Sequence, residues 1–316
     1  MRLPRGPIAA FIAMLFAAVG VGAGCGSDPG VVGSVRVGGS STLLPFVQQA
    51  TAAFTQQHPL ARVRVDLTGT GDGFALLCDG IAGAAAASRP ESPREQRACA
   101  ASGVQAVPLL VGRDAIVAFT SRGSRVPACL STAELRRAAG AAPAPLRTWA
   151  GIGPAGLPLV VVVPEPGSGT RDAFVDQVLS DPAGGGGPGL RPDAVPATQG
   201  AQMLARVLGT RGAIGITGFA TVQPALDRVR AIQVNDGDGC VAPTPESIAA
   251  DSYPLTRDLF MFVQANGAGS DGRAARAFGD IVASPGLLGR PGSGLSPADI
   301  RATEDAWQAG VAGASG

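Results

Sequence analysis

The chain has 316 residues and a formal net charge of +1, and all 25 of its positive side chains are arginines, because it contains no lysine. The balanced charge argues against a nucleic-acid-binding surface, so no nucleic-acid partner is expected. The missing lysine excludes a Walker-type nucleotide loop, which depends on one. About 290 residues follow the leader described next, enough for two compact lobes.

The chain opens with a positively charged start, an apolar segment and small residues, which indicate a signal peptide over residues 1–24. Cys25 follows directly and resembles the lipidated cysteine of a bacterial lipobox, although Gly22 stands where lipoboxes usually carry leucine. We therefore expect an exported lipoprotein on the outer face of the cytoplasmic membrane, held there by a lipid on Cys25 and tethered by residues 25–33. Ordinary secretion, for example to the periplasm, is the alternative.

The remaining four cysteines are an even number, which suits disulfides in an exported protein. Three pairings can be drawn. We expect Cys78–Cys99, which closes a short loop, and Cys129–Cys240, which closes a long one. A metal site is the competing interpretation, but the spacings are wide, no CxxC motif occurs and the only histidine is His58. No metal or other cofactor is therefore expected.

Strand-like and helix-like patterns alternate through the first half of the folded part. In chain order we expect a strand at 34–37, a helix at 43–58, a strand at 62–67, a helix at 74–78, strands at 105–111 and 114–120, and a helix at 131–139. This last helix has the pattern of a capping box, because Ser131 is followed three residues later by Glu134.

The second half continues the alternation. It predicts a strand at 157–163, helices at 171–179 and 200–208, strands at 213–217 and 231–234, a helix at 245–250, a strand at 259–263, and helices at 273–283 and 297–309. The glycine-rich segment 181–193 between them is expected to be a loop. This alternation favours an α/β architecture with largely parallel sheets.

Three of the expected strand-to-helix junctions share one chemistry: GGSST at 38–42, TGTGDGF at 68–74 and GSGTR at 167–171. Each combines glycines with hydroxyl side chains at the start of a helix, where unpaired backbone N–H groups attract anions. Helix capping alone explains any one of them. The three together predict a binding site for a small oxyanion.

Two arginines lie beside these junctions. Arg171 follows the third, and Arg89 lies next to Ser88 in an expected loop after the second, so we expect both guanidiniums to contribute to the site. The motifs of two enzyme classes are missing from the sequence. It has no GxSxG motif of a serine hydrolase, and GTGDGF departs from the fingerprint of dinucleotide-binding enzymes. His58, beside Pro59 at a helix end, is expected on the surface.

Six segments occur in an order and spacing that resemble the phosphate-binding component of the high-affinity phosphate ABC importer: VGGSSTLLPFV, TGTGDGFALLCDG, AASRP, PGSGTRDAF, GAIGITGFA and YPLTRDLFMFV. The resemblance covers nearly the whole mature chain. It implies the two-lobe type II periplasmic-binding-protein fold, in which each lobe is a mixed, mostly parallel sheet flanked by helices and the ligand lies in the cleft. It also implies lobe one at 34–117 plus 236–316 and lobe two at 118–235.

The resemblance implies a set of phosphate ligands, which are Ser41, Thr42, Thr70, Ser88, Arg89, Ser168, Gly169 and Thr170. Many members carry an arginine where this chain has Pro164, so Arg171 is expected to take its place. The segment Tyr253–Phe260 is expected to be a returning strand rather than a ligand segment.

One departure concerns the acid that accepts the proton of hydrogen phosphate. Many members place an aspartate where Ser88 lies, and the nearest carboxylates here are those of Asp72 and Asp172. Asp172 is already explained as a first-turn helix residue that the helix dipole favours. Asp72 is therefore the expected acceptor.

The resemblance implies a monomeric, non-enzymatic receptor that captures inorganic phosphate and delivers it to ABC permease subunits. Other interpretations stay open from the sequence. They are a phosphate-sensing or scavenging lipoprotein without a permease, a receptor for another oxyanion such as sulfate, and, less favoured, a phosphate-ester hydrolase.

Overall fold

The computed structural model describes residues 30–166, 168–180, 189–290 and 292–314. The predicted signal peptide, the lipidation site Cys25 and most of the tether lie outside this part, as do Gly167 and most of the expected loop 181–193. Within the described ranges, no helix combines the length and apolarity needed to cross a membrane.

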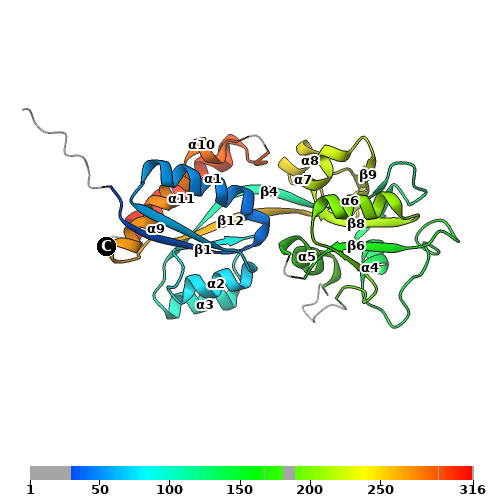
Figure 1. Cartoon of the computed structure of the whole chain (residues 1–316), viewed down its shortest axis with the longest axis horizontal. Coiled ribbons are helices and arrows are strands. Elements are labelled where there is room, and N and C mark those ends of the chain that lie inside the picture. Colours follow the sequence, from blue (N-terminus) through cyan, green and yellow to red (C-terminus); the bar gives the residue numbers. More distant parts are fainter. Residues whose placement is uncertain (1–29, 167, 181–188, 291, 315–316) are drawn as a thin grey trace, which may run out of the picture. The chain divides into compact units, whose positions relative to one another are not determined.

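The strands of the described residues form one nine-stranded mixed sheet and one three-stranded sheet (Figure 1). The larger sheet has the order β2-β1-β3-β12-β4-β8-β6-β7, with β9 paired to β4. Its strands are β1 (Gly33–Gly39), β2 (Ala61–Asp66), β3 (Ala84–Ala87), β4 (Ala106–Ser121), β6 (Val160–Pro164), β7 (Val195–Ala197), β8 (Ala213–Gly218), β9 (Val229–Ala231) and β12 (Thr256–Gln264). The smaller sheet contains β5 (Cys129–Ser131), β10 (Gln233–Asn235) and β11 (Cys240–Val241).

The strand pairs on the flanks of the large sheet are parallel, and those in its middle are antiparallel. β1 runs parallel to β2 and β3, and β6 runs parallel to β7 and β8. β4 is antiparallel to both β12 and β8, and Figure 1 shows β4 and β12 side by side. The strands expected at 105–111 and 114–120 are the single strand β4, which pairs first with β12 and then with β8.

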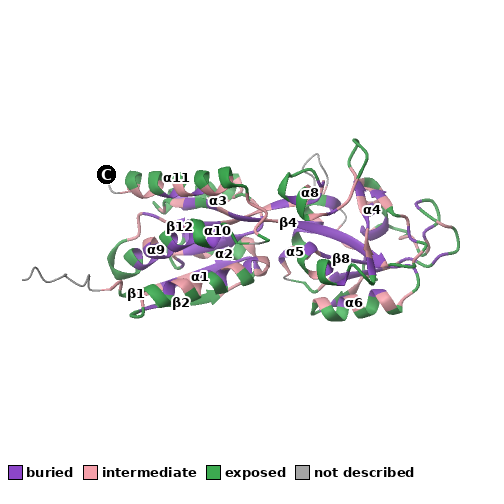
Figure 2. Cartoon of the chain, turned by 90° about the horizontal axis from the view of Figure 1, so that it is seen from above, coloured by how far each residue is buried: buried purple, intermediate pink, exposed green. Residues whose placement is uncertain are grey.

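Helices cover the sheet with their buried sides and leave their other sides exposed to solvent (Figure 2), and most of the buried residues are hydrophobic. The regular helices are α1 (Leu44–Gln57), α2 (Thr70–Cys78), α3 (Pro93–Ala101), α4 (Thr132–Ala139), α5 (Gly169–Phe174), α6 (Gly200–Gly209), α7 (Phe219–Val222), α8 (Pro245–Ala249), α9 (Gly269–Val282), α10 (Pro285–Leu288) and α11 (Pro297–Ala314). The short helical segments are η1 (Ser41–Leu43), the π-helical η2 (Val175–Leu179) and η3 (Gln223–Ala225). The predicted capping box at Ser131 and Glu134 is present and starts α4.

The buried apolar residues form two main cores. The first, which we call core one, is built by residues between Val35 and Val111 and by residues between Met261 and Trp307. Core two is built by residues between Ala115 and Leu255. Residues 236–255, expected in lobe one, contribute Tyr253 and Leu255 to core two. The core membership therefore favours a return to lobe one near the start of β12.

Both predicted disulfides are present. Cys78–Cys99 joins the end of α2 to α3, and Cys129–Cys240 joins β5 to β11. The second disulfide links the outer strands of the three-stranded sheet, because β10 lies between β5 and β11. It therefore ties Cys240 to the part of the chain that forms core two.

Candidate functional site

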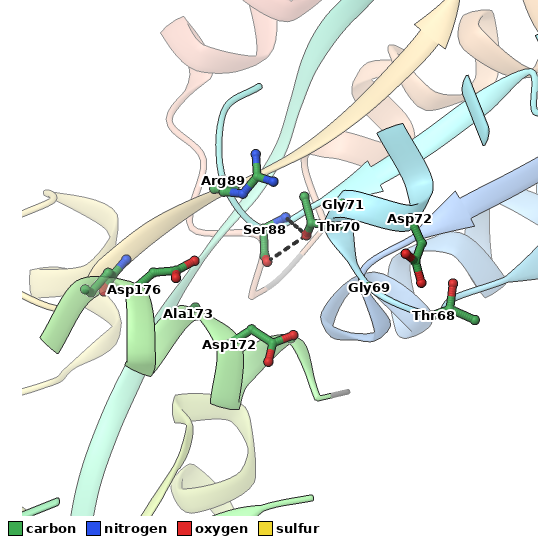
Figure 3. Close-up of a pocket in the computed structure, with 12 residues that line it drawn as sticks. Thr68, Gly69, Thr70, Gly71, Asp72, Ser88, Arg89, Asp172, Ala173 and Asp176 are labelled. Atoms are coloured by element: carbon green, nitrogen blue, oxygen red, sulfur yellow. Dashed lines mark hydrogen bonds between the residues drawn. The ribbon is translucent and has the colours of Figure 1, made fainter. Parts of the chain in front are cut away.

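A cavity of about 330 Å³ lies between the start of α2 and the segment formed by α5 and η2 (Figure 3). Its lining comes from three stretches of chain that are far apart in the sequence. These residues are Thr68, Gly69, Thr70, Gly71, Asp72, Ser88, Arg89, Gly169, Asp172, Ala173, Asp176 and Gln177. Five predicted site residues are among them: Thr70, Asp72, Ser88, Arg89 and Gly169.

Two of the predicted hydroxyls meet at the cavity wall. Thr70 is the first residue of α2, and Ser88 follows the last residue of β3. Their hydroxyl oxygens are 3.2 Å apart, and the Ser88 N–H donates to Thr70 Oγ1 at 3.3 Å. The central strand β3 therefore holds Ser88 against the start of α2, as Figure 3 shows.

Arg89 lines the same cavity, but its guanidinium is committed to the protein. Its two terminal nitrogens donate to the two carboxylate oxygens of Glu95, each at 2.8 Å, and one also donates to the Pro90 carbonyl at 2.9 Å. Burial alone would raise the pKa of Glu95, but hydrogen bonds from Arg89 and Ser92 hold it below its usual value. The positive charge of Arg89 is therefore largely neutralised by Glu95.

Three carboxylates also line the cavity, those of Asp72, Asp172 and Asp176. Asp172 and Asp176 lie on one helical segment, opposite Ser88 and Thr70 in Figure 3. Partial burial raises the pKa of both groups, and the neighbouring Asp176 raises the pKa of Asp172 further. Asp172 thus has a place in the cavity beyond its role in the helix, and Asp176 is an acid that the sequence reasoning missed.

Two of the other predicted hydroxyls, those of Thr42 and Thr170, contact a buried arginine, Arg257, whose side chain is 2% exposed. Its guanidinium donates to the Gly169 carbonyl at 2.9 Å and to Asp114 Oδ2 at 2.7 Å. Longer contacts reach Thr42 Oγ1 at 3.4 Å and Thr170 Oγ1 at 3.3 Å. We call Thr42, Asp114, Gly169, Thr170 and Arg257 the Arg257 cluster.

Gly169 joins the cluster to the cavity, because it belongs to both. Its N–H reaches Ser41 Oγ at 3.5 Å. A Cβ atom at this position would lie 2.4 Å from Ser40 Oγ and 2.8 Å from Thr42 Oγ1, so only glycine allows the starts of η1 and α5 to approach this closely. The first and third glycine-rich junctions therefore meet at one point.

Ser41, Thr42, Ser168, Thr170 and Arg171 do not line the cavity, and two of them, Ser168 and Arg171, also lie outside the Arg257 cluster and its contact with Ser41. Ser168 precedes α5, and its carbonyl accepts the N–H of Asp172 at 3.0 Å. The Arg171 guanidinium turns back to the carbonyl of Pro164 at 3.1 Å. Arg171 thus anchors α5 to the end of β6.

Arg257 is the main residue that the sequence reasoning missed. The segment Tyr253–Phe260 does contain the start of a returning strand, β12, but Arg257 projects from it into the midst of Thr42, Gly169 and Thr170. One feature of the sequence could have identified Arg257: it is an arginine at an inward position of a half-buried strand. Charged residues are rarely buried unless they have partners, so such an arginine indicates a specific role.

No metal-binding group emerges from the described ranges, since they contain no cluster of three or more His, Cys, Asp or Glu residues suited to hold an ion. What the site offers chemically is a set of hydroxyls, one buried guanidinium and carboxylates that can accept protons.

Residues 26–285 match the family model described as the PBP superfamily domain. Protein SphX of Synechocystis sp. is 31% identical over 252 residues, which cover 78% of this chain and 73% of that protein. Phosphate-binding protein PstS of Staphylococcus epidermidis is 23% identical over 258 residues, 79% of this chain and 75% of that protein.

A crystal structure from Planctomyces limnophilus, described as a possible phosphate binding protein, has the same fold. Its TM-score is 0.72 at 23% identity, and the match covers 89% of this chain and 99% of that one. Three findings indicate the same family and fold. They are the match to the family model over most of the sequence, the similarity to SphX, and the mixed sheet with its two cores. The chain therefore belongs to the PBP superfamily and has the two-lobe type II periplasmic-binding-protein fold.

Proposed function

We propose that this protein is an extracytoplasmic receptor that captures inorganic phosphate and delivers it to an ABC permease. One observation carries the proposal: the three glycine-rich junctions, far apart in sequence, bring Thr42, Thr70 and Thr170 to a single region around Gly169. Converging hydroxyls and amides suit a small oxyanion that has lost its water shell.

The proposed donors are Ser41, Thr42, Thr70, Ser88, Ser168, Gly169 and Thr170. The Gly169 nitrogen and Ser41 Oγ are 3.5 Å apart, so one ion can bind both groups. Arg89 and Arg171 already donate hydrogen bonds within the protein, Arg89 to the Glu95 carboxylate and Arg171 to the Pro164 carbonyl. We therefore assign Arg89 to holding Ser88 in place and Arg171 to fixing α5.

Selectivity for phosphate over sulfate would come from the cavity carboxylates. Hydrogen phosphate has a proton to donate, whereas sulfate would face an ionised carboxylate with no proton between them. Mismatches of this kind can discriminate by roughly 10⁴–10⁵. Asp72, Asp172 and Asp176 are the proposed acceptors, since all three line the cavity next to the hydroxyls.

The setting of the protein is part of the same proposal. Residues 1–24 would direct export, Cys25 would carry the lipid anchor, and the monomeric receptor would work at the outer face of the cytoplasmic membrane. The lobes would be 34–117 plus 236–316 and 118–235. We propose moving the second boundary to about residue 256, because Tyr253 and Leu255 pack into core two.

Isothermal titration calorimetry of the exported protein with phosphate, sulfate, arsenate and molybdate tests the proposal. We expect micromolar or tighter phosphate binding, which corresponds to about 8 kcal/mol or more, and much weaker sulfate binding. Binding of sulfate but not phosphate would make the protein a receptor for a different oxyanion. Heat with none of these ions, or turnover of a generic phosphate ester, would contradict the receptor proposal.

A further inference from the structure

We infer that Arg257, rather than Arg89 or Arg171, is the cation that binds the anion, and that the anion sits in the Arg257 cluster at the Gly169 end of the cavity. This inference rests on the proposed function. It identifies which guanidinium serves the ligand and where the ligand lies.

The first argument is an unpartnered donor. Arg257 uses both terminal nitrogens, on Gly169 and on Asp114, but its buried Nε–H has no hydrogen-bond partner among the described residues. Buried polar groups nearly always have a partner, and an unsatisfied group next to a charge is especially costly. A ligand oxygen would supply the missing acceptor.

The second argument is the division between short and long contacts. The hydrogen bonds of Arg257 to Gly169 and Asp114, at 2.9 Å and 2.7 Å, have normal lengths. Those to the hydroxyls of Thr42 and Thr170, at 3.4 Å and 3.3 Å, are long. The long contacts are weak and easily exchanged. An anion entering here would leave the short pair intact and accept hydrogen bonds from both hydroxyls.

The third argument is charge. The main cavity is lined by three carboxylates against one guanidinium, which is itself paired with Glu95. A divalent anion is repelled by such a lining. In the Arg257 cluster one carboxylate, that of Asp114, contacts the guanidinium, and it accepts a hydrogen bond from one terminal nitrogen. The anion is therefore favoured beside Arg257, with the cavity carboxylates at its outer side.

This placement also fits the observed contacts of Arg171, which was expected to bind the anion. Arg171, the expected substitute, donates to the carbonyl of Pro164 instead. Arg257 reaches the same junction from β12, because its guanidinium holds the carbonyl of Gly169 at the start of α5. Arg257 therefore brings positive charge to the start of α5 from β12.

The test is phosphate titration of four variants by calorimetry: Arg257→Lys, Arg257→Gln, Arg171→Gln and, as a surface control, Arg301→Gln on the exposed side of α11. Losing one charge-assisted hydrogen bond should weaken binding roughly 10- to 100-fold. We expect this loss in both Arg257 variants, including Arg257→Lys, because lysine keeps the charge but lacks the fork of donors. Arg171→Gln should have a much smaller effect and Arg301→Gln none.

The outcomes separate the two claims. If the wild-type protein binds none of the oxyanions, the proposed function fails and this inference fails with it. If the wild type binds phosphate and the Arg257 variants bind equally well, only the inference is overturned.

A second arm covers variants that fail to fold because Asp114 loses its partner. It comprises the double variant Arg257→Gln/Asp114→Asn, which removes both charges, and a crystal structure of the wild type with phosphate. A phosphate oxygen within hydrogen-bond distance of Arg257 Nε supports the inference. A phosphate bound without contact to Arg257 contradicts it.

Discussion

At the scale of single residues, the cavity carboxylates carry the argument for selectivity. Asp172 and Asp176 lie on one helical segment facing the hydroxyls of Thr70 and Ser88. They are acceptors only, so they favour a ligand that brings a proton. The nearby Arg89 donates to both carboxylate oxygens of Glu95, and burial still raises the pKa of Asp172 and of Asp176.

Replacing these acids should relax discrimination between phosphate and sulfate. We expect Asp172→Asn and Asp176→Asn, alone or together, to reduce the phosphate-to-sulfate affinity ratio at least about tenfold, because an amide can donate to an aprotic oxyanion. Competition calorimetry measures the ratio. Asp79→Asn, an exposed change at the end of α2, is the matched control. An unchanged ratio in the double variant would leave Asp72 as the remaining acceptor.

The same two acids predict how binding and stability depend on pH. Burial raises the pKa of Asp172 and of Asp176, so both become protonated at a higher pH than an exposed aspartate does. Phosphate affinity should therefore fall as the pH drops through this raised pKa, since a protonated carboxyl no longer accepts the ligand proton. Titrations between pH 8 and pH 4.5 test this.

Protein stability should change with pH in the opposite direction to phosphate affinity. A carboxyl whose pKa is raised by folding destabilises the ionised folded state, so the penalty is full at neutral pH and disappears as the pH falls. Asp176→Asn should thus slightly raise the melting temperature of the ligand-free protein at pH 7 while it impairs selectivity. A lower melting temperature would show that the carboxylate stabilises the fold.

At the scale of elements, the close approach of η1 and α5 depends on Gly169. We expect Gly169→Ala to weaken phosphate binding by about tenfold or more, because its Cβ would collide with Ser40 and Thr42 and push the two helix starts apart. Gly209→Ala, at the end of α6 with open space around it, is the control. Equal affinities of the two variants would show that this contact is irrelevant to the site.

The start of α3 depends on a carboxylate that serves two partners. Glu95 accepts hydrogen bonds from the backbone and hydroxyl of Ser92 and from Arg89. We expect Glu95→Gln to lower the free energy of unfolding by about 1–2 kcal/mol, measured by urea denaturation at pH 7. Because folding lowers the pKa of Glu95, its contribution is present above the usual carboxyl pKa and is lost in acid. An unchanged midpoint would contradict this.

Elements with a clear pattern could be predicted from the sequence, and those without one could not. The capping box at Ser131 and the amphipathic pattern of α6 gave helices close to their observed bounds. The fully buried β3 is a run of four alanines, which have low strand propensity, so the sequence predicts a loop there. It is a strand because β1 and β12 pair with it on both sides.

At the scale of the whole molecule, the two-lobe fold that the resemblance implies is confirmed, whereas the oxyanion site that the three junctions predict stays a prediction. The sequence does not predict Arg257 as a site residue, because the role of a charged residue in a strand depends on which side chains of the other lobe lie close to it. That information is absent from local patterns. Asp176 is not predicted for the same reason, since it lines the cavity only because η2 continues α5 along the cavity wall.

The central claim is that donors from both proposed lobes bind one dehydrated anion. A crystal structure of the exported protein grown with saturating phosphate tests it most directly. The account predicts a single tetrahedral anion that accepts hydrogen bonds from Thr42, Thr170 and Arg257. An anion bound by residues of only one lobe, or no anion in the region around Gly169, would contradict it.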